Sequence, residues 1–249
     1  MQMPDLDKYH FHYIPMEKDK LFDLSCEYMI SQLERIGDEF NYLVEVCSEL
    51  TAQFTKPTEQ TDWILIKKCF SSVDKVIDTY VKLVRCSKLS LGESIGRVVS
   101  NHTIFKNIRY NPNVHLQSVI AQKIRNTQEH FEERLQDHFL EMAPFSILQN
   151  KGVNIHWKIN FGNCGYHFTN TILNNVEEKF DINNLTYQSY IEDTKTKILS
   201  DETIILQDIW KDIQEIVTLI DENIKDQINV HGICCPPIRG LSITMRPHN

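Results

Sequence analysis

The spacing of apolar and polar residues predicts a chain built mainly from long helices. Between Pro15 and Pro57, apolar residues recur at steps of three and four, as they do along one face of an amphipathic helix. This stripe contains Leu21, Leu24, Tyr28, Met29, Leu33, Ile36, Phe40, Leu43, Cys47, Leu50 and Phe54. Similar stripes predict helices over about 61–87 and 114–141. Gly37 lies inside the first helix, where glycine costs about 1 kcal/mol relative to alanine and permits a kink or a small break.

The pattern changes after Pro144. Apolar and polar residues alternate over 153–161, with the two-residue period of a β-strand, and Lys151-Gly152 is the turn that we expect before it. Helical spacing returns over 171–180, a less regular piece follows over 186–199, and a strong helix is predicted over 201–227. The remaining residues, 231–249, are predicted to be irregular. The β content expected from this pattern is therefore one small hairpin.

These elements predict a mainly α fold, a long-helix bundle with a small β-hairpin insertion. The expected organisation is a helical bundle over 1–143, the hairpin insertion over 144–168, and C-terminal helices with an irregular tail over 169–249, packed on the same core. The chain has 249 residues, of which 41% are hydrophobic and 24% are charged, as in ordinary globular proteins.

The location expected for the protein is the cytoplasm. No apolar run approaches the ~20 residues needed to span a bilayer, so a membrane partner is not expected. The first residues lack the basic and then apolar pattern of a secretory signal. The seven cysteines are an odd number and scattered, which favours reduced thiols over a disulfide framework.

Charge is distributed unevenly along the chain. The net charge of -8 argues against a general nucleic-acid binder. Yet residues 64–125 hold eleven Lys or Arg against three acids, within a chain that is otherwise strongly acidic. A local excess of positive charge is expected either of a surface that faces a polyanion or of a solvated helix face that pairs with acidic neighbours.

One stretch of the third predicted helix, KIRNTQEHFEERLQDHF over 123–139, carries the strongest candidate chemistry. Asn126 and His130 are four residues apart and share a helix face, and Arg125 and Glu129 form a second such pair. Histidine can transfer a proton near neutral pH, and arginine presents a fork of donors suited to phosphate. Together they could cleave RNA without a metal: the 2′-hydroxyl attacks the adjacent phosphate, Arg125 stabilises the developing charge, and His130 serves as acid or base.

The spacing Arg125-Asn126-x-x-x-His130 resembles the motif of the HEPN superfamily of helical ribonucleases and nucleotide-binding proteins. Over roughly 60–140 the chain is also similar to uncharacterised bacterial helical proteins that share an R-N-x-x-E-H-F-[DE]-E-R-L block. The resemblance implies a HEPN-like bundle in which Arg125, Asn126 and His130 are the catalytic set. It implies a metal-independent endoribonuclease of a toxin or defence system, with no cofactor. The implied partners are RNA, a second copy in a homodimer, and a protein partner such as an antitoxin.

The same residues also fit a non-catalytic protein. Glu129, Glu132, Glu133 and Asp137 place negative charge beside the expected phosphate site, which repels RNA unless basic residues outweigh it. Glu129 and Arg134 are accessory candidates, in that Glu129 could orient His130 or an Arg134 of a partner chain. Alternatively, Arg125, Glu129, Glu133 and Arg134 form a salt-bridge ladder along one helix. The competing function is a helical protein that uses this face for dimerisation or for binding a partner.

A second constellation has the spacing of metal ligands. Cys164-x-x-His167 and His231-x-x-Cys234, the latter followed by Cys235, could supply four ligands to a structural zinc and tie the hairpin to the tail. Cysteines near aromatic residues are more often packing groups, so the main expectation is that no metal is bound. His10-x-His12 would lie on one side of a strand and is a further alternative.

Overall fold

The computed structural model describes fourteen stretches of the chain, and they divide between two compact units. The described residues are 9–13, 20–54, 63–87, 103–105, 108, 111, 117–129, 155–160, 165–170, 176–182, 184–192, 199–231, 234–238 and 241–245. Unit 1 comprises Met1–Asn41, Thr79–Leu116 and Asp208–Asn249, and unit 2 comprises Tyr42–Asp78 and Gln117–Gln207. The segment predicted as one bundle, 1–143, thus supplies residues to both units.

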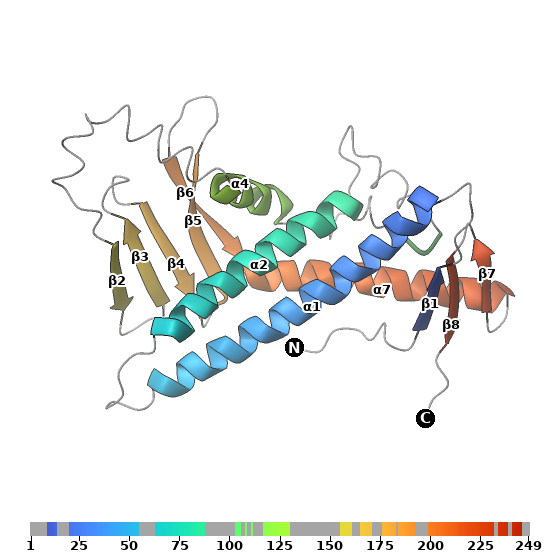
Figure 1. Ribbon diagram of the computed structural model, residues 1–249, viewed down its shortest axis with the longest axis horizontal. Coiled ribbons are helices and arrows are strands. Elements are labelled where there is room, and N and C mark those ends of the chain that lie inside the picture. Colours follow the sequence, from blue (N-terminus) through green and yellow to red (C-terminus); the bar gives the residue numbers. More distant parts are fainter. Residues whose placement is uncertain are drawn as a thin grey trace. The chain divides into compact units, whose positions relative to one another are not determined.

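The mainly α class is confirmed, because long helices hold most of the described residues (Figure 1). Helix α1 spans Lys20–Phe54, α2 spans Trp63–Ser87, α4 spans Ser118–Glu129 and α7 spans Leu206–His231, with a short 3-10 helix η1 at Thr103–Phe105. The first two match the predicted helices closely. Helix α1 runs unbroken through Gly37, whose position is buried. Of the third predicted helix, α4 confirms 118–129, and 130–141 lie outside the described residues.

Unit 1 combines parts of three helices with a small sheet. The ring of Phe40 on α1 lies 5.0 Å from that of Trp210 on α7, and the buried Tyr80 hydroxyl of α2 donates a hydrogen bond to Asp212 of α7. The antiparallel sheet has the order β1-β8-β7, formed by Tyr9–Tyr13, Leu241–Met245 and Cys234–Ile238. The prediction of an irregular tail is therefore wrong, because β7 and β8 pair with each other and β8 also pairs with β1, from the opposite end of the chain.

Unit 2 contains an antiparallel sheet of five strands in the order β2-β3-β4-β5-β6. The strands are Ile155–Asn160, Gly165–Asn170, Val176–Asp181, Thr186–Glu192 and Leu199–Ile205. The strand predicted over 153–161 is present as β2, and it pairs with β3, from Ile155 with Asn170 to Asn160 with Gly165. The arm predicted before Lys151-Gly152 lies outside the described residues. Lys151-Gly152, the turn expected before β2, lies outside the described residues.

The sheet extends beyond β2 and β3. The helical prediction over 171–180 is wrong at 176–180, which lie in β4, and 171–175 lie outside the described residues. The strong helix begins five residues later than expected, because β6 takes up 199–205. Along β5, Tyr187, Ser189 and Ile191 are all buried, which is the two-residue period of a strand. Leu185, at φ 49°, lies in the turn before β5 and accepts a backbone hydrogen bond from Leu206, the first residue of α7. Strand pairing, which a local pattern does not contain, decides the structure of this region.

Helices of unit 2 bury their apolar faces against each other and the sheet. The ring of Phe70 on α2 lies 6.4 Å from the rings of both Phe180 and Tyr187, and α4 lies beside β5 and β6 (Figure 1). The Sγ atoms of Cys47 on α1 and Cys69 on α2 are 3.8 Å apart. This thiol contact raises the pKa of Cys69, which burial raises further, and it lowers the pKa of Cys47. Cys47, Cys69 and Cys86 are buried thiols that take part in no disulfide.

Within the described ranges, no helix combines the length and the apolar character that crossing a membrane requires.

Candidate functional site

Helix α4 carries Arg125 and Asn126 of the predicted motif, and one side of this helix is buried. Its buried positions are Ser118, Ala121, Ile124 and Thr127, which recur every three residues and form the side that lies against the rest of unit 2. The Thr127 hydroxyl donates a hydrogen bond to the backbone carbonyl of Lys123, within the same helix. Arg125 follows the fully buried Ile124, and for this reason its side chain emerges at the edge of the buried face.

Arg125 is held by two carboxylates. Its Nε donates a hydrogen bond to Oδ1 of Asp78 on α2 at 2.8 Å, and its Nη2 donates one to Oε1 of Glu129, one turn further along α4, at 2.5 Å. The Arg125 side chain is only 13% exposed, whereas those of Asp78 and Glu129 are 33% and 47% exposed. Because the two carboxylates together outweigh the single guanidinium, this cluster carries net negative charge and does not favour a phosphate.

Asn126 does not join this cluster. Its side chain is exposed, and its Oδ1 accepts a hydrogen bond from Nε2 of Gln122 at 2.5 Å. The structure therefore brings together Arg125 and Glu129 from the predicted set, while Asn126 has a separate partner. His130 and Arg134 lie outside the described residues, as do Glu132, Glu133 and Asp137.

A second contact between α4 and α2 adjoins the Arg125 cluster. Gln128 donates a hydrogen bond from Nε2 to Oδ1 of Asp74 at 2.7 Å, and the Tyr187 hydroxyl lies 3.4 Å from the same nitrogen. Crowding by protein atoms raises the pKa of Asp74, although hydrogen bonds from Gln128 and Tyr187 lower it. Asp74 and Asp78 are four residues apart on α2, so one face of α2 receives both Gln128 and Arg125.

The residues predicted as metal ligands are distributed over several elements. His167 lies in β3, His231 is the last residue of α7, Cys234 and Cys235 begin β7, and Cys164 is outside the described residues. His10 and His12 lie two apart on β1 and share one side of that strand, as predicted. Among the residues that the structure describes, no group of three or more His, Cys, Asp or Glu side chains could hold a metal ion.

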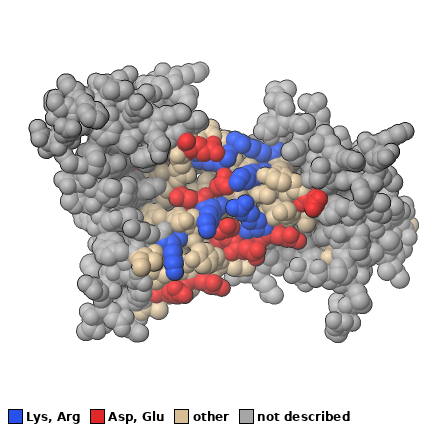
Figure 2. Space-filling model, viewed as in Figure 1, with Lys and Arg blue, Asp and Glu red and all other residues tan. Residues whose placement is uncertain are grey.

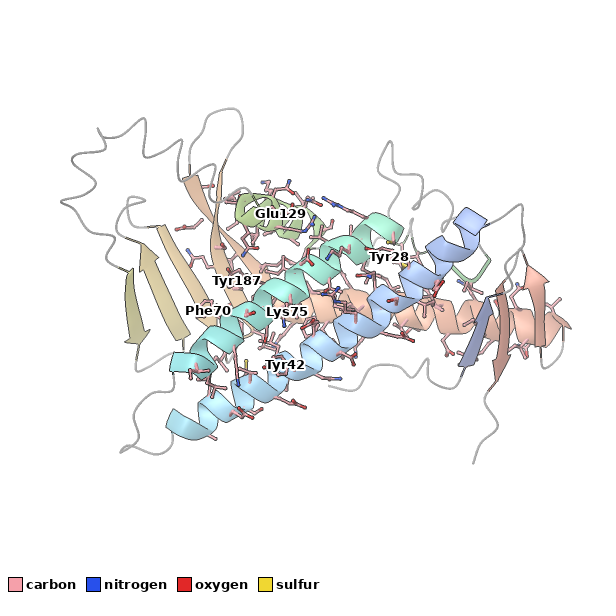
Figure 3. The ribbon with its side chains drawn as sticks, viewed as in Figure 1. Tyr28, Tyr42, Phe70, Lys75, Glu129 and Tyr187 are labelled. Atoms are coloured by element: carbon pink, nitrogen blue, oxygen red, sulfur yellow. The ribbon has the colours of Figure 1, made fainter. Side chains whose placement is uncertain are left out.

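A groove between α1 and α2 in unit 2 was not predicted. It has a volume of about 330 Å³ and is lined by Tyr42 of α1 and by five residues of α2, namely Ile64, Lys68, Ser71, Ser72 and Lys75. We call this the α1–α2 groove; Figure 3 labels Tyr42 and Lys75 on its two helices. Tyr42 is 40% exposed and Ile64 is 67% exposed. Both residues fall outside the apolar stripes of their helices, and this departure is the sequence signal that could have revealed the groove.

The two sides of the groove have opposite charge. On α1, Glu45 and Glu49 follow Tyr42 at steps of three and four and are exposed, which places an acidic stripe on that side. On α2, Lys68 and Lys75 are exposed and line the groove directly. None of these four side chains forms an ion pair with a described residue. Figure 2 shows that both signs of charge lie on the face visible in that view.

Comparisons of the chain with protein-family models, with curated proteins and with solved structures find no match.

Proposed function

We propose that this chain is a HEPN-like helical protein without ribonuclease activity, and that it binds a protein partner through the α1–α2 groove. The long helices and the Arg125-Asn126-x-x-x-His130 spacing support the HEPN-like assignment. The groove supports the binding role, because it combines exposed apolar surface with charged side chains that have no partner within the described chain.

The proposal that the chain lacks ribonuclease activity rests on the ion pairs of Arg125 with Asp78 and Glu129. Its guanidinium joins α4 to α2 through Asp78, and a side chain that is 13% exposed and held by two carboxylates acts as a structural link. To bind a phosphate through Nη1, Arg125 would have to expose a nitrogen that is now buried. The carboxylates of Asp78 and Glu129, which hold the other side of the guanidinium, would repel the same phosphate.

The composition of the groove favours a protein over a nucleic acid. Tyr42, Lys68 and Lys75 alone would suit single-stranded RNA, since an aromatic ring can stack on a base and lysines can contact phosphates. Glu45 and Glu49, however, are exposed acids on the same face of α1 as Tyr42, beside the groove. A protein surface with apolar side chains and charges of both signs complements this arrangement, whereas a polyanion meets repulsion from one side.

A metal-independent endoribonuclease of a toxin or defence system is the second candidate. It is favoured by one feature of the Arg125 cluster: the buried Nη1 of Arg125 has no hydrogen-bond partner within the described residues, and a phosphate oxygen could accept from it. In this function Arg125 would stabilise the negative charge on the attacked phosphate, His130 would transfer protons, and Asn126 would position the site.

An RNA cleavage assay in the absence of metal ions decides between these functions. Wild type, Arg125→Ala, His130→Ala and the control Lys123→Ala are incubated with a single-stranded RNA, after each variant has been shown to fold by circular dichroism. We expect no cleavage that depends on His130. Cleavage by wild type and Lys123→Ala that is lost in His130→Ala would establish the ribonuclease and overturn the non-catalytic assignment.

A further inference from the structure

We propose that Cys47 of α1 and Cys69 of α2 form an oxidation site, at which a peroxide converts the two thiols into a disulfide that joins these helices. Their Sγ atoms are 3.8 Å apart, although the residues lie 22 positions apart in the sequence. The inference goes beyond the proposed function, because it does not depend on what the α1–α2 groove binds.

The geometry of the two helices allows the bond to form. Helices α1 and α2 run side by side in opposite directions in unit 2 (Figure 1), and Cys47 and Cys69 are buried where the helices meet. A disulfide bond is about 2.05 Å long, so the two sulfur atoms have to approach each other by about 1.8 Å. Shifts of about 1–2 Å between packed helices occur in folded proteins, and a cysteine side chain can also change its rotamer. The bond can therefore form without unfolding of unit 2.

Cys47 is the thiol that reacts first. The thiolate is the nucleophile in thiol oxidation, and contact with the Cys69 thiol lowers the pKa of Cys47, although burial opposes this change. The same contact raises the pKa of Cys69, and burial raises it further, so Cys69 keeps its proton. Cys47 is also the more accessible residue, since it is 6% exposed and Cys69 is 0% exposed. Hydrogen peroxide, which is little larger than water, can reach a residue that larger oxidants cannot.

The oxidation has two steps and consumes one peroxide. The Cys47 thiolate attacks one oxygen of hydrogen peroxide, the O–O bond breaks, a sulfenic acid forms, and the leaving hydroxide takes up the proton that Cys47 released. Sγ of Cys69 then attacks Sγ of Cys47, the S–O bond breaks, and the hydroxide leaves as water with the proton of Cys69. The two sulfurs together lose two electrons and the peroxide gains them. The products are one disulfide and two waters.

The disulfide joins α1 to α2 beside the α1–α2 groove. Lys68, which lines the groove, directly precedes Cys69, and Ser72, which also lines it, lies about one turn after Cys69. A cross-link between residues 22 positions apart mainly restricts the unfolded chain, so oxidation should lower the equilibrium constant for unfolding by about a hundredfold. Disulfides that form in a reducing compartment are usually transient and redox-sensing, and this pair has the proximity that such a role requires.

Peroxide treatment of the folded full chain tests the proposal. Wild type and the control Cys86→Ser, which removes a third buried thiol of α2, are treated with hydrogen peroxide, quenched with catalase, blocked with N-ethylmaleimide in urea and digested without reduction. Mass spectrometry should find the peptide of Cys47 linked to that of Cys69 in both proteins. In urea titrations the oxidised wild type should have the lower unfolding constant, and dithiothreitol should abolish the difference.

The variant Cys69→Ser separates the two steps. It removes the thiol that attacks the sulfenic acid, so dimedone should label Cys47 in this variant, whereas Cys47→Ser should gain no label at Cys69. Label at Cys69 alone would overturn the order of the steps. Peptides of Cys47 and Cys69 that stay unlinked in wild type, while its circular dichroism spectrum is that of the folded chain, would overturn the site itself. Because wild type alone gives that result, a variant that failed to fold would not affect it, and neither outcome bears on the RNA assay.

Discussion

The Arg125 cluster and the α1–α2 groove both place charged residues on helices of unit 2, yet these charges are used in different ways. At the cluster, Arg125 is enclosed and its carboxylate partners come from the same chain. In the groove, Lys68 and Lys75 are exposed and form no ion pair within the described chain. A charge that is satisfied internally contributes mainly to stability, whereas one without an internal partner remains available for binding. Substitutions at the two places should therefore affect different measurements.

The largest expected effect on stability comes from removing Arg125. Arg125→Ala removes the ion pair that joins α4 to Asp78 of α2, a side chain only 33% exposed, and should lower the free energy of unfolding by about 2 kcal/mol in a urea titration. The matched control is Lys123→Ala, which breaks an exposed 3.7 Å ion pair with Glu202 and should change stability by less than about 0.5 kcal/mol. Equal losses from the two variants would contradict the structural role of Arg125.

A smaller effect, dependent on pH, is expected at Asp74. Because its pKa in the folded protein is raised above the ordinary value of 3.8, the folded state holds this proton more tightly than the unfolded state. The contribution of Asp74 to stability is therefore greatest at low pH and falls as the pH rises through the raised pKa. Asp74→Asn, which can still accept from Gln128, should gain stability relative to wild type as the pH goes from about 4 to about 7. Urea titrations at both pH values measure this, and a difference that is constant or of opposite sign contradicts the raised pKa.

The smallest effect on stability is expected in the groove. Lys75→Ala removes an exposed side chain with no internal partner, so the free energy of unfolding should stay within about 0.5 kcal/mol of wild type. A loss of stability as large as that of Arg125→Ala would remove the distinction between the groove and the Arg125 cluster.

The helices could be predicted because their signal is local. In α1, Leu33, Ile36, Phe40 and Leu43 recur at helical spacing and are all buried. Apart from β2, whose alternation over 153–161 predicted it, the strands could not be predicted, because their signal is short or distant. In β5 the polar Ser189 is one of the buried residues, so the strand does not show a regular alternation of apolar and polar residues. Strand β1 pairs with β8 from the opposite end of the chain, and no local pattern predicts that pairing.

The candidate site was predictable only in part. The spacing of Arg125 and Glu129 predicted their ion pair, as in the salt-bridge alternative, and the structure confirms that contact. The Asp78 partner, 47 residues before Arg125, depends on how α4 packs on α2 and has no local signal. The groove depends likewise on two helices, since Tyr42 and Lys75 become neighbours only when α1 and α2 pair. The ribonuclease and the HEPN-like assignment remain predictions.

The boundary between the two units has a consequence for cooperativity. Two of its crossing points fall inside helices, between Asn41 and Tyr42 of α1 and between Asp78 and Thr79 of α2. Helical hydrogen bonds continue across both points, so each unit contains only part of either helix. We therefore expect that a chain cut at either point would leave both pieces with an interrupted helix and a less stable core.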